Sequence, residues 1–173
     1  MVCAAALLLG TAAFAQDVRY NFDQGTDFTK FRTFKWYEAP GGVKPDQLTD
    51  NNIRQAIETE LAKKGLSKGD ATPDLALVYH VSTNQEKELT TWGSAPGWGY
   101  GWRYGGGMTQ TTTSTITVGT LVLDMYQVGD KKMVWRGMAT KTLNPSKDPE
   151  KNRKNLQKAM AKLLKNYPPK EKK

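Results

Sequence analysis

GTLVLDMYQVGDKKMVWRG, residues 119–137, contains two apolar-rich runs on either side of Gly129, Asp130 and Lys131. Glycine and aspartate between two such runs are a signal for a tight turn. The first run extends back to residue 109, and the second reaches residue 143. The sequence therefore predicts a long antiparallel β-hairpin made of strands 109–128 and 132–143.

Aligning apolar positions with apolar positions sets the register expected for this hairpin. Asp124 and Arg136 then fall together on one face, where they can form a cross-strand ion pair. We interpret this pair as structural, since an exposed pair contributes about 0 to 1 kcal/mol; a functional carboxylate at Asp124 is the alternative. The other face is expected to carry Leu121, Leu123, Met125, Met133, Trp135 and Ala139.

Three further strands are expected before the hairpin. Apolar and polar residues alternate over 18–23, and residues 33–37 are rich in aromatic side chains. Residues 75–81 are apolar on both faces, as in a covered strand, and they continue as a polar strand towards Leu89. Aromatic residues in or beside the strands are expected in the core or at its edge: Tyr20, Phe28, Phe31, Trp36 and Trp135.

Two amphipathic helices complete the expected elements. The first spans about residues 50–64, because its apolar residues recur every four positions before the stop signal Gly65. The second begins at Asp148 and Pro149, a helix cap followed by proline at the first helical position. It ends before residues 168–169, and its apolar stripe consists of Leu156, Met160, Leu163, Leu164 and Tyr167.

The order of elements is β-β-α-β-β-β-α, and the connections resemble hairpins rather than βαβ crossovers. This order predicts an α+β fold in which a largely antiparallel sheet carries both helices on one face. No internal repeat or second domain is visible, so residues 16–173 are expected to form one domain.

Residues 92–107 place five aromatic side chains among seven glycines. The returning arm, residues 109–115, is polar on both faces, so the two arms are expected to project from the sheet as a solvated ribbon with this segment at its tip. Exposed aromatic rings on a glycine loop can stack on sugars, enter a membrane interface or fill a partner's pocket. A loosely packed low-complexity linker is the alternative. The candidate contact residues are Trp92, Trp98, Tyr100, Trp102 and Tyr104.

The first 15 residues have the pattern of a signal peptide. An uncharged, alanine- and leucine-rich run from Ala4 ends in Ala13-Phe14-Ala15, the small-x-small pattern that precedes cleavage. The run is too short to span a bilayer. We therefore expect cleavage after Ala15 and a periplasmic or secreted protein. Cys3 lies at the start of the run, so no lipid anchor, disulfide or thiol chemistry is expected after cleavage.

The chain is basic, with 25 Lys and Arg against 17 Asp and Glu, and a formal net charge of +8. Such a surface attracts anionic partners, which in the cell envelope are lipid head groups or saccharides rather than nucleic acid. The basic tail, residues 168–173, follows a lysine stripe on the last helix. A stripe of this kind is usually a solvated face, but with the tail it could dock on an anionic surface. The stripe consists of Lys154, Lys158, Lys162 and Lys165.

Groups suited to catalysis are scarce in the sequence. His80 is the only histidine, carboxylate clusters with calcium-loop spacing are absent, and no Gly-x-Ser-x-Gly motif occurs. No metal, cofactor or catalytic residue is therefore expected. Asp23 and Asp27 could be paired acid/base carboxylates, but beside Gly25 they are better explained as turn residues. An envelope hydrolase that uses a carboxylate such as Asp124 with His80 remains an alternative, and it requires these groups to meet in a concave pocket.

Five blocks along the chain resemble domain-of-unknown-function family 4136. They are Tyr20-Asn21-Phe22-Asp23, Asp27-Phe28 with Thr33-Phe34-Lys35-Trp36, Gly119-Thr120-Leu121-Val122-Leu123-Asp124, Val134-Trp135-Arg136-Gly137 and Tyr167-Pro168-Pro169. The resemblance implies an envelope protein, often lipid-anchored, without an established activity or a catalytic residue to carry over. This sequence departs from it by lacking a lipid-acceptor cysteine after the apolar run.

Together these observations predict an envelope protein that binds or scaffolds without catalysis. Its expected partners are a glycan, an anionic lipid surface or another envelope protein. The alternatives are the hydrolase and a subunit of a larger envelope assembly. The subunit alternative predicts an apolar patch above about 400 Å² on the sheet face opposite the helices.

Overall fold

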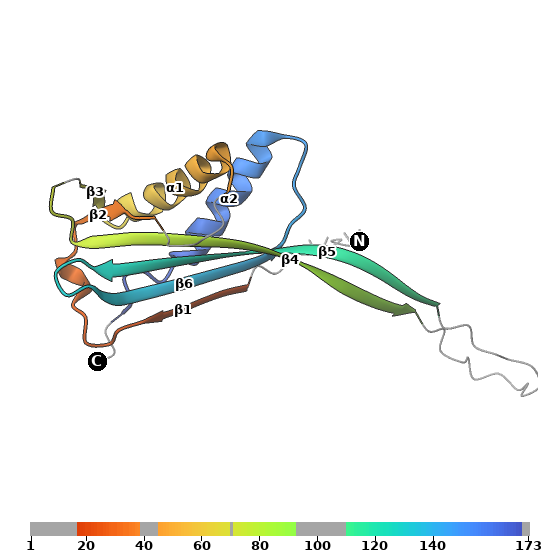
Figure 1. Ribbon diagram of the computed structural model, residues 1–173, viewed down its shortest axis with the longest axis horizontal. Helices are drawn as coiled ribbons and strands as arrows, with labels where there is room; N and C mark the ends of the chain where they lie inside the picture. Colours follow the sequence, from red (N-terminus) through yellow and green to blue (C-terminus); the bar gives the residue numbers. More distant parts are fainter. Residues whose placement is uncertain (1–16, 39–44, 70, 93–109, 171–173) are drawn as a thin grey trace, which may run out of the picture.

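A computed structural model describes residues 17–38, 45–69, 71–92 and 110–170 of the 173-residue chain. One six-stranded sheet, in the order β1-β6-β5-β4-β2-β3, carries both helices on the same face (Figure 1). The elements are β1 (Asp17–Phe22), the short 3-10 helix η1 (Phe28–Lys30), β2 (Thr33–Trp36), α1 (Gln47–Ala62), β3 (Ser67–Lys68), β4 (Leu75–Trp92), β5 (Gln110–Gln127), β6 (Lys132–Thr142) and α2 (Pro149–Leu163).

The predicted α+β fold with a largely antiparallel sheet is confirmed, but one connection is not hairpin-like. β2 pairs in parallel with both β3 and β4, and α1 lies between β2 and these strands in the chain. The expectation that no βαβ crossover occurs was therefore wrong. The parallel register pairs Phe34 with Leu75 and Trp36 with Leu77, which places these apolar residues on the helix-covered face.

The hairpin of β5 and β6 has the expected register at its centre. Asp124 pairs with Arg136, and Met125 pairs with Trp135. A bulge follows, because Tyr126 then pairs with Met133. The bulge moves Met133 to the face opposite Met125, so its expected place on the core face was wrong. Val134, the extra residue, is 1% exposed.

Both helices begin at an aspartate that accepts hydrogen bonds from the first turn. Asp148 accepts from the backbone of Glu150, and Pro149 follows it, as expected. α1 begins at Gln47, earlier than the expected residue 50, because Asp46 accepts from the amides of Leu48 and Thr49. Neither helix, nor any other in the described ranges, is long and apolar enough to cross a membrane.

The core lies between the sheet and the two helices. Trp135 and Tyr167 are among its largest fully buried residues, and their rings meet edge to face at 5.7 Å. Trp135 Nε1 and the Tyr167 hydroxyl are buried without a hydrogen-bond partner among the described residues. Tyr20, on the edge strand β1, is 42% exposed and stacks on Phe22, so it lies at the edge of the core rather than inside it.

β4 and β5 continue together beyond the body as a two-stranded ribbon (Figure 1). Their pairing runs as far as Trp92 and Gln110, whereas β6 pairs with β5 only as far as Val118. The projecting arms expected from the polar sequence are therefore present. Residues 93–109, which include most of the expected tip, lie outside the described residues.

Candidate functional site

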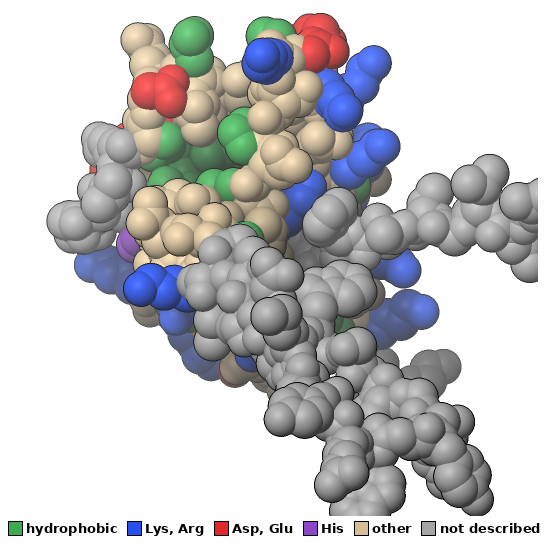
Figure 2. Space-filling model, turned by 90° about the vertical axis from the view of Figure 1, so that its right-hand side faces the viewer, with side chains coloured by type: hydrophobic (Ala, Val, Ile, Leu, Met, Phe, Trp, Pro, Cys, Tyr) green, Lys and Arg blue, Asp and Glu red, His purple; other side chains and the backbone are tan. Residues whose placement is uncertain are grey.

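One face of α2 is a row of exposed lysines. The helix buries Met160 and Leu163 against the core, and this fixes which of its faces is turned to solvent. Lys and Arg side chains gather along the flank of the molecule that carries this helix (Figure 2). The four lysines expected to form a stripe are all exposed: Lys154, Lys158, Lys162 and Lys165.

Few acidic side chains offset this row. Arg153 pairs with Glu150 at 2.8 Å in the first turn of α2. Within the described part of the chain, Lys154, Lys158 and Lys165 form no ion pair. These three lysines are therefore available to an external anion. Together with Lys162 we call them the α2 lysine face, in which Lys165 lies just after the end of the helix.

Asp124, Arg136 and His80 lie on the sheet face that carries no helix. Arg136 Nε and Nη2 donate to the two carboxylate oxygens of Asp124 at 2.6 and 2.7 Å. The hydrogen bond to Asp124 raises the pKa of Arg136. His80 Nε2 stands 4.0 Å from Asp124 Oδ2, and its side chain is 42% exposed.

This arrangement gives the hydrolase alternative no support. Both oxygens of Asp124 are occupied by Arg136, and the carboxylate itself is 1% exposed. His80 and Asp124 contribute nothing to the lining of the cleft described next. A general base needs an accessible lone pair beside a site for substrate, and Asp124 offers neither.

A cleft of about 710 Å³ lies where the loops after β1 and before β4 meet the β5–β6 turn. Several of its charged lining residues, including three aspartates, are engaged in local contacts. Asp23 accepts from Thr26 and Lys132 at 2.5 and 2.9 Å, and these bonds lower its pKa. Asp27 accepts from the hydroxyl and the amide of Thr29, which lower its pKa in the same way. Both aspartates therefore act as turn residues, as expected.

Asp74, which also lines the cleft, accepts hydrogen bonds from backbone amides. Its Oδ2 accepts from the amides of Arg32 and Thr33 at 2.8 and 2.9 Å, and these bonds lower the pKa of the carboxyl. Within the described ranges, no group of three or more His, Cys, Asp or Glu residues could hold a metal ion. The hydrogen bonds of Asp23, Asp27 and Asp74 therefore stabilise the loops around the cleft.

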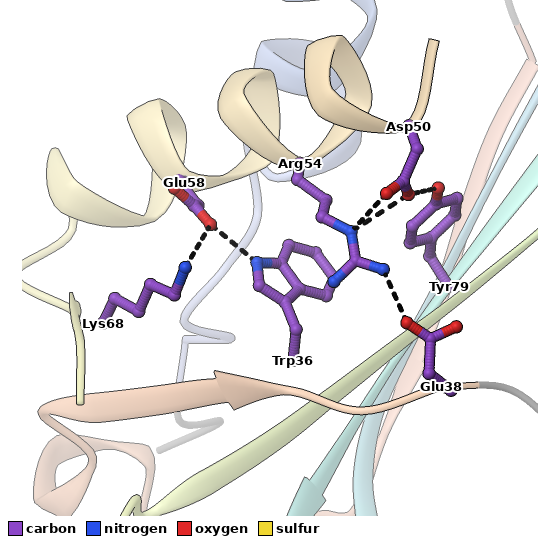
Figure 3. Close-up of polar contacts among 7 residues, drawn as sticks. All are labelled: Trp36, Glu38, Asp50, Arg54, Glu58, Lys68 and Tyr79. Atoms are coloured by element: carbon purple, nitrogen blue, oxygen red, sulfur yellow. Dashed lines mark hydrogen bonds and ion pairs between the residues drawn. The ribbon is translucent and has the colours of Figure 1, made fainter. Parts of the chain in front are cut away.

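A polar and aromatic cluster beneath α1 was missed from the sequence (Figure 3). Arg54 donates to both oxygens of Asp50 at 3.0 Å and to Glu38 at 3.1 Å. Its guanidinium lies 5.2 Å from the ring centroid of Trp36 and 5.8 Å from that of Tyr79. The spacing of Asp50 and Arg54, four residues apart on a helix, was the available signal.

The same cluster connects α1 to the sheet through hydrogen bonds. Trp36 Nε1 donates to Glu58 at 2.7 Å, and the Tyr79 hydroxyl donates to Asp50. Burial, followed by the bond to Asp50, raises the pKa of Tyr79. Arg54 is held by two carboxylates and two rings, so we interpret it as a structural clamp rather than a ligand site.

The expected aromatic contact residues lie at or beyond the end of the ribbon. Trp92 is the last residue of β4. The other four, Trp98, Tyr100, Trp102 and Tyr104, lie outside the described residues. The aromatic tip therefore stays a prediction.

The sequence profile of a family described as a domain of unknown function, DUF4136, matches residues 18–169. The chain belongs to this family. The resemblance carried by the five sequence blocks is thereby confirmed. Comparison of the sequence with curated proteins gives no match.

Comparison of the fold with solved structures finds similar proteins. A PDZ domain protein from Parabacteroides distasonis is similar with a TM-score of 0.55 and 18% identity; the match covers 90% of this chain but only 36% of that protein. A dodecameric PelC variant from Paraburkholderia phytofirmans matches with a TM-score of 0.50 and 13% identity, over 87% of this chain and 95% of that one. At these identities the likeness shows a shared fold.

Proposed function

We propose that this DUF4136 protein is a non-catalytic binding or scaffolding component of the cell envelope that docks on anionic surfaces through the α2 lysine face. The observation that carries the proposal is the exposure of all four lysines, three on α2 and Lys165 just after its end, while the apolar side of this helix is buried in the core. Because the core holds α2 in place, the lysines are presented on one side without a separate folding step. A periplasmic or secreted location, after cleavage near Ala15, belongs to the same proposal.

Electrostatics supports such a contact. The net charge of +8 attracts the protein to anionic surfaces, and the α2 lysine face orients it there. Each lysine near an acidic lipid surface contributes about 1 kcal/mol. The three lysines that form no ion pair among the described residues can therefore contribute up to about 3 kcal/mol, which corresponds to roughly a hundredfold in affinity. The contribution is screened by salt.

Vesicle binding tests the proposal. Cosedimentation is measured with phosphatidylcholine vesicles that contain or lack phosphatidylglycerol. The test variant replaces the α2 lysine face by Gln, and the control variant replaces four exposed lysines elsewhere by Gln: Lys30, Lys63, Lys68 and Lys131. We expect wild type and control to bind only the anionic vesicles, and the test variant to lose most of this binding. Equal binding by both variants, or none by wild type, contradicts the proposal.

The aromatic segment is proposed as a second contact, with glycans as its ligand class. Its aromatic residues among glycines can stack on sugar rings. Peptidoglycan pull-down compares wild type with a variant that has Ala at Trp92, Trp98 and Trp102. Loss of binding in the variant at high salt is the expected result, because stacking does not depend on charge. Binding that persists in the variant contradicts a role for these rings.

A subunit of an envelope assembly is the second candidate function. The PelC variant of similar fold is a dodecamer, and this is the reason to test self-association here. The sheet face away from the helices carries apolar side chains, such as Val78, Val122 and the 37% exposed Met138, beside the charged Arg136. This mixed face is a less suitable interface than an apolar patch.

A further inference from the structure

Among the described residues, the outer edge of β5 has no partner strand over residues 110–116. β6 is the neighbour of β5 from Val118 onwards, and the amide of Leu143 donates to the carbonyl of Thr117 at 2.7 Å as the last bond on this side. Residues 110–116 continue as a strand that has β4 as its partner on the other side. Among the described residues, nothing pairs with the edge of this segment that faces away from β4.

Strand geometry decides which backbone groups this edge presents. In antiparallel sheets, the N–H and C=O of one residue point to the same neighbour, and successive residues point to opposite neighbours. The backbone of Thr117 points to the β6 side, since it accepts from Leu143. By alternation, Thr111, Thr113 and Thr115 point their N–H and C=O groups to this side, beyond the reach of β6.

The sequence of this edge lacks the features that protect free edges. Residues 110–118 read QTTTSTITV, without a charged residue, a proline or a glycine. Natural proteins discourage edge pairing with charges, prolines or bulges. The other free edges have charges. The edge strands β1 and β3 contain Arg19 and Lys68, and the outer part of β4 contains Glu86 and Lys87. Residues 110–116 therefore form the free edge best suited to accept another strand.

We propose that residues 110–116 of β5 pair antiparallel with the same residues of a second copy of this chain. The register follows from the three free positions. Thr113 pairs with Thr113 of the second copy at a two-fold axis, and Thr111 pairs with Thr115 on either side. Each of these pairs exchanges two hydrogen bonds. A shift that involved Thr117 would collide with its bond to Leu143.

The pairing gives a four-stranded sheet in the order β4-β5-β5-β4. An isolated two-stranded ribbon is marginally stable in water, and two added strands provide the missing neighbours. Because the paired strands are antiparallel and each ribbon leaves its body in one direction (Figure 1), the two bodies lie at opposite ends of the new sheet. This separation keeps the net charge of +8 on each copy apart. The two-fold arrangement is closed, so it predicts a dimer rather than a fibre.

The first test is the mass of the purified full-length protein, measured by sedimentation equilibrium over a wide range of concentrations without vesicles. Thr113→Pro removes an outward donor and places a ring on the edge, while the bonds to β4 are kept. Lys87→Pro is the matched control, because its backbone points outward on the other edge of the same ribbon. We expect wild type and Lys87→Pro to reach twice the mass of one chain, and Thr113→Pro to stay at the mass of one chain.

The second test uses charge and distinguishes self-pairing from loss of folding. Like charges directly opposite each other on paired strands are destabilising, and opposite charges are stabilising. Because Thr113 meets its own copy, we expect Thr113→Lys and Thr113→Glu each to lose the dimer, and an equal mixture of the two to regain it. Restoration in the mixture requires both variants to be folded.

Three outcomes overturn the inference. They are a wild type that stays at the mass of one chain at every concentration, a Thr113→Pro variant that still dimerises, and a charge mixture that stays monomeric. A monomeric wild type that captures an added peptide of sequence QTTTSTITV would assign the edge to a different chain. The inference is independent of the α2 lysine face, so the vesicle experiment and this one fail separately.

Discussion

Arg136 meets Asp124 through two donors, Nε and Nη2, at 2.6 and 2.7 Å, and shields a carboxylate that is only 1% exposed. The side chain of Arg136 is itself 49% exposed. The two members of this ion pair are therefore unequal: one charge is inside the protein, and the other can reach water. The pair lies on the sheet face without helices, where the side chain of Arg136 covers Asp124 and shields it from water.

This inequality predicts unequal mutational costs. Arg136→Gln leaves the buried carboxylate without its cation, so we expect a loss of about 3 kcal/mol in the free energy of unfolding. Asp124→Asn leaves a guanidinium that water can solvate, and we expect a loss of about 1 kcal/mol. Urea denaturation of the two variants measures both values. A larger loss for Asp124→Asn would show that Arg136 depends on Asp124 rather than the reverse.

Gly137 is expected to tolerate no side chain. A Cβ at this position would overlap Cη2 of Trp135 and would lie 2.9 Å from Cδ1 of Leu163. Both residues are buried, so Gly137→Ala should cost about 1 to 3 kcal/mol through overpacking. Gly129→Ala is the matched control, because nothing lies within 4 Å of its Cβ position; its effect should stay within about 0.5 kcal/mol. Thermal denaturation distinguishes the two, and equal melting temperatures would refute the overpacking.

The hydrogen bonds to Asp74 predict a pH-dependent contribution. The amides of Arg32 and Thr33 lower the pKa of this carboxyl below the ordinary 3.8. The unfolded chain therefore takes up the proton first as the pH falls, and the folded state loses stability. We expect the unfolding free energies of wild type and Asp74→Ala to differ most at neutral pH and to converge below pH 3.8. A difference that widens in acid would contradict this sign.

Tyr167→Phe should stabilise the protein. The hydroxyl of Tyr167 is buried without a partner among the described residues, and the residue is 2% exposed. Removing an unsatisfied buried hydroxyl abolishes its desolvation penalty, so we expect a gain of about 1 kcal/mol. Chemical denaturation at neutral pH measures this gain. A loss of stability would mean that the hydroxyl has a partner, such as a buried water.

The same burial predicts behaviour in alkali. It raises the pKa of Tyr167 above the ordinary 10.0, so the unfolded state ionises first as the pH rises. Wild type should therefore lose stability above pH 10 more steeply than Tyr167→Phe. Unfolding curves on either side of that pH provide the comparison, and parallel pH profiles would speak against burial as the cause.

Local sequence patterns were enough to predict three features. The turn signal predicted the hairpin, the alternation of apolar residues predicted the pairing of Asp124 with Arg136, and an aspartate followed by proline predicted the start of α2. The parallel pairing of β2 with β4 could not be predicted, because nothing within either segment encodes its neighbour. The bulge that buries Val134 could not be predicted either, because one extra residue in the strand leaves its apolar composition unchanged.

For the candidate site, too, some features could be predicted from the sequence and others could not. The α2 lysine face followed from helical periodicity, and the apolar stripe of that helix identified which side is exposed. The cluster around Arg54 joins residues from two strands and a helix, and only its Asp50 contact lies within one element. The near-complete burial of Asp124 on an open face depends on the conformation of Arg136, which alternation does not determine.

The position of β1 governs when the sheet can be completed. β1 is among the first residues of the described chain, and it pairs with β6, near the other end of the sequence. At about 5 to 20 residues per second, β1 waits roughly 5 to 25 seconds after synthesis before its partner exists. Such non-local pairing also gives a high contact order, which slows folding. A chain stopped before residue 132 would therefore leave β1 with no strand to join and β5 without its neighbour on that side, so incomplete chains expose two sheet edges that the finished protein pairs.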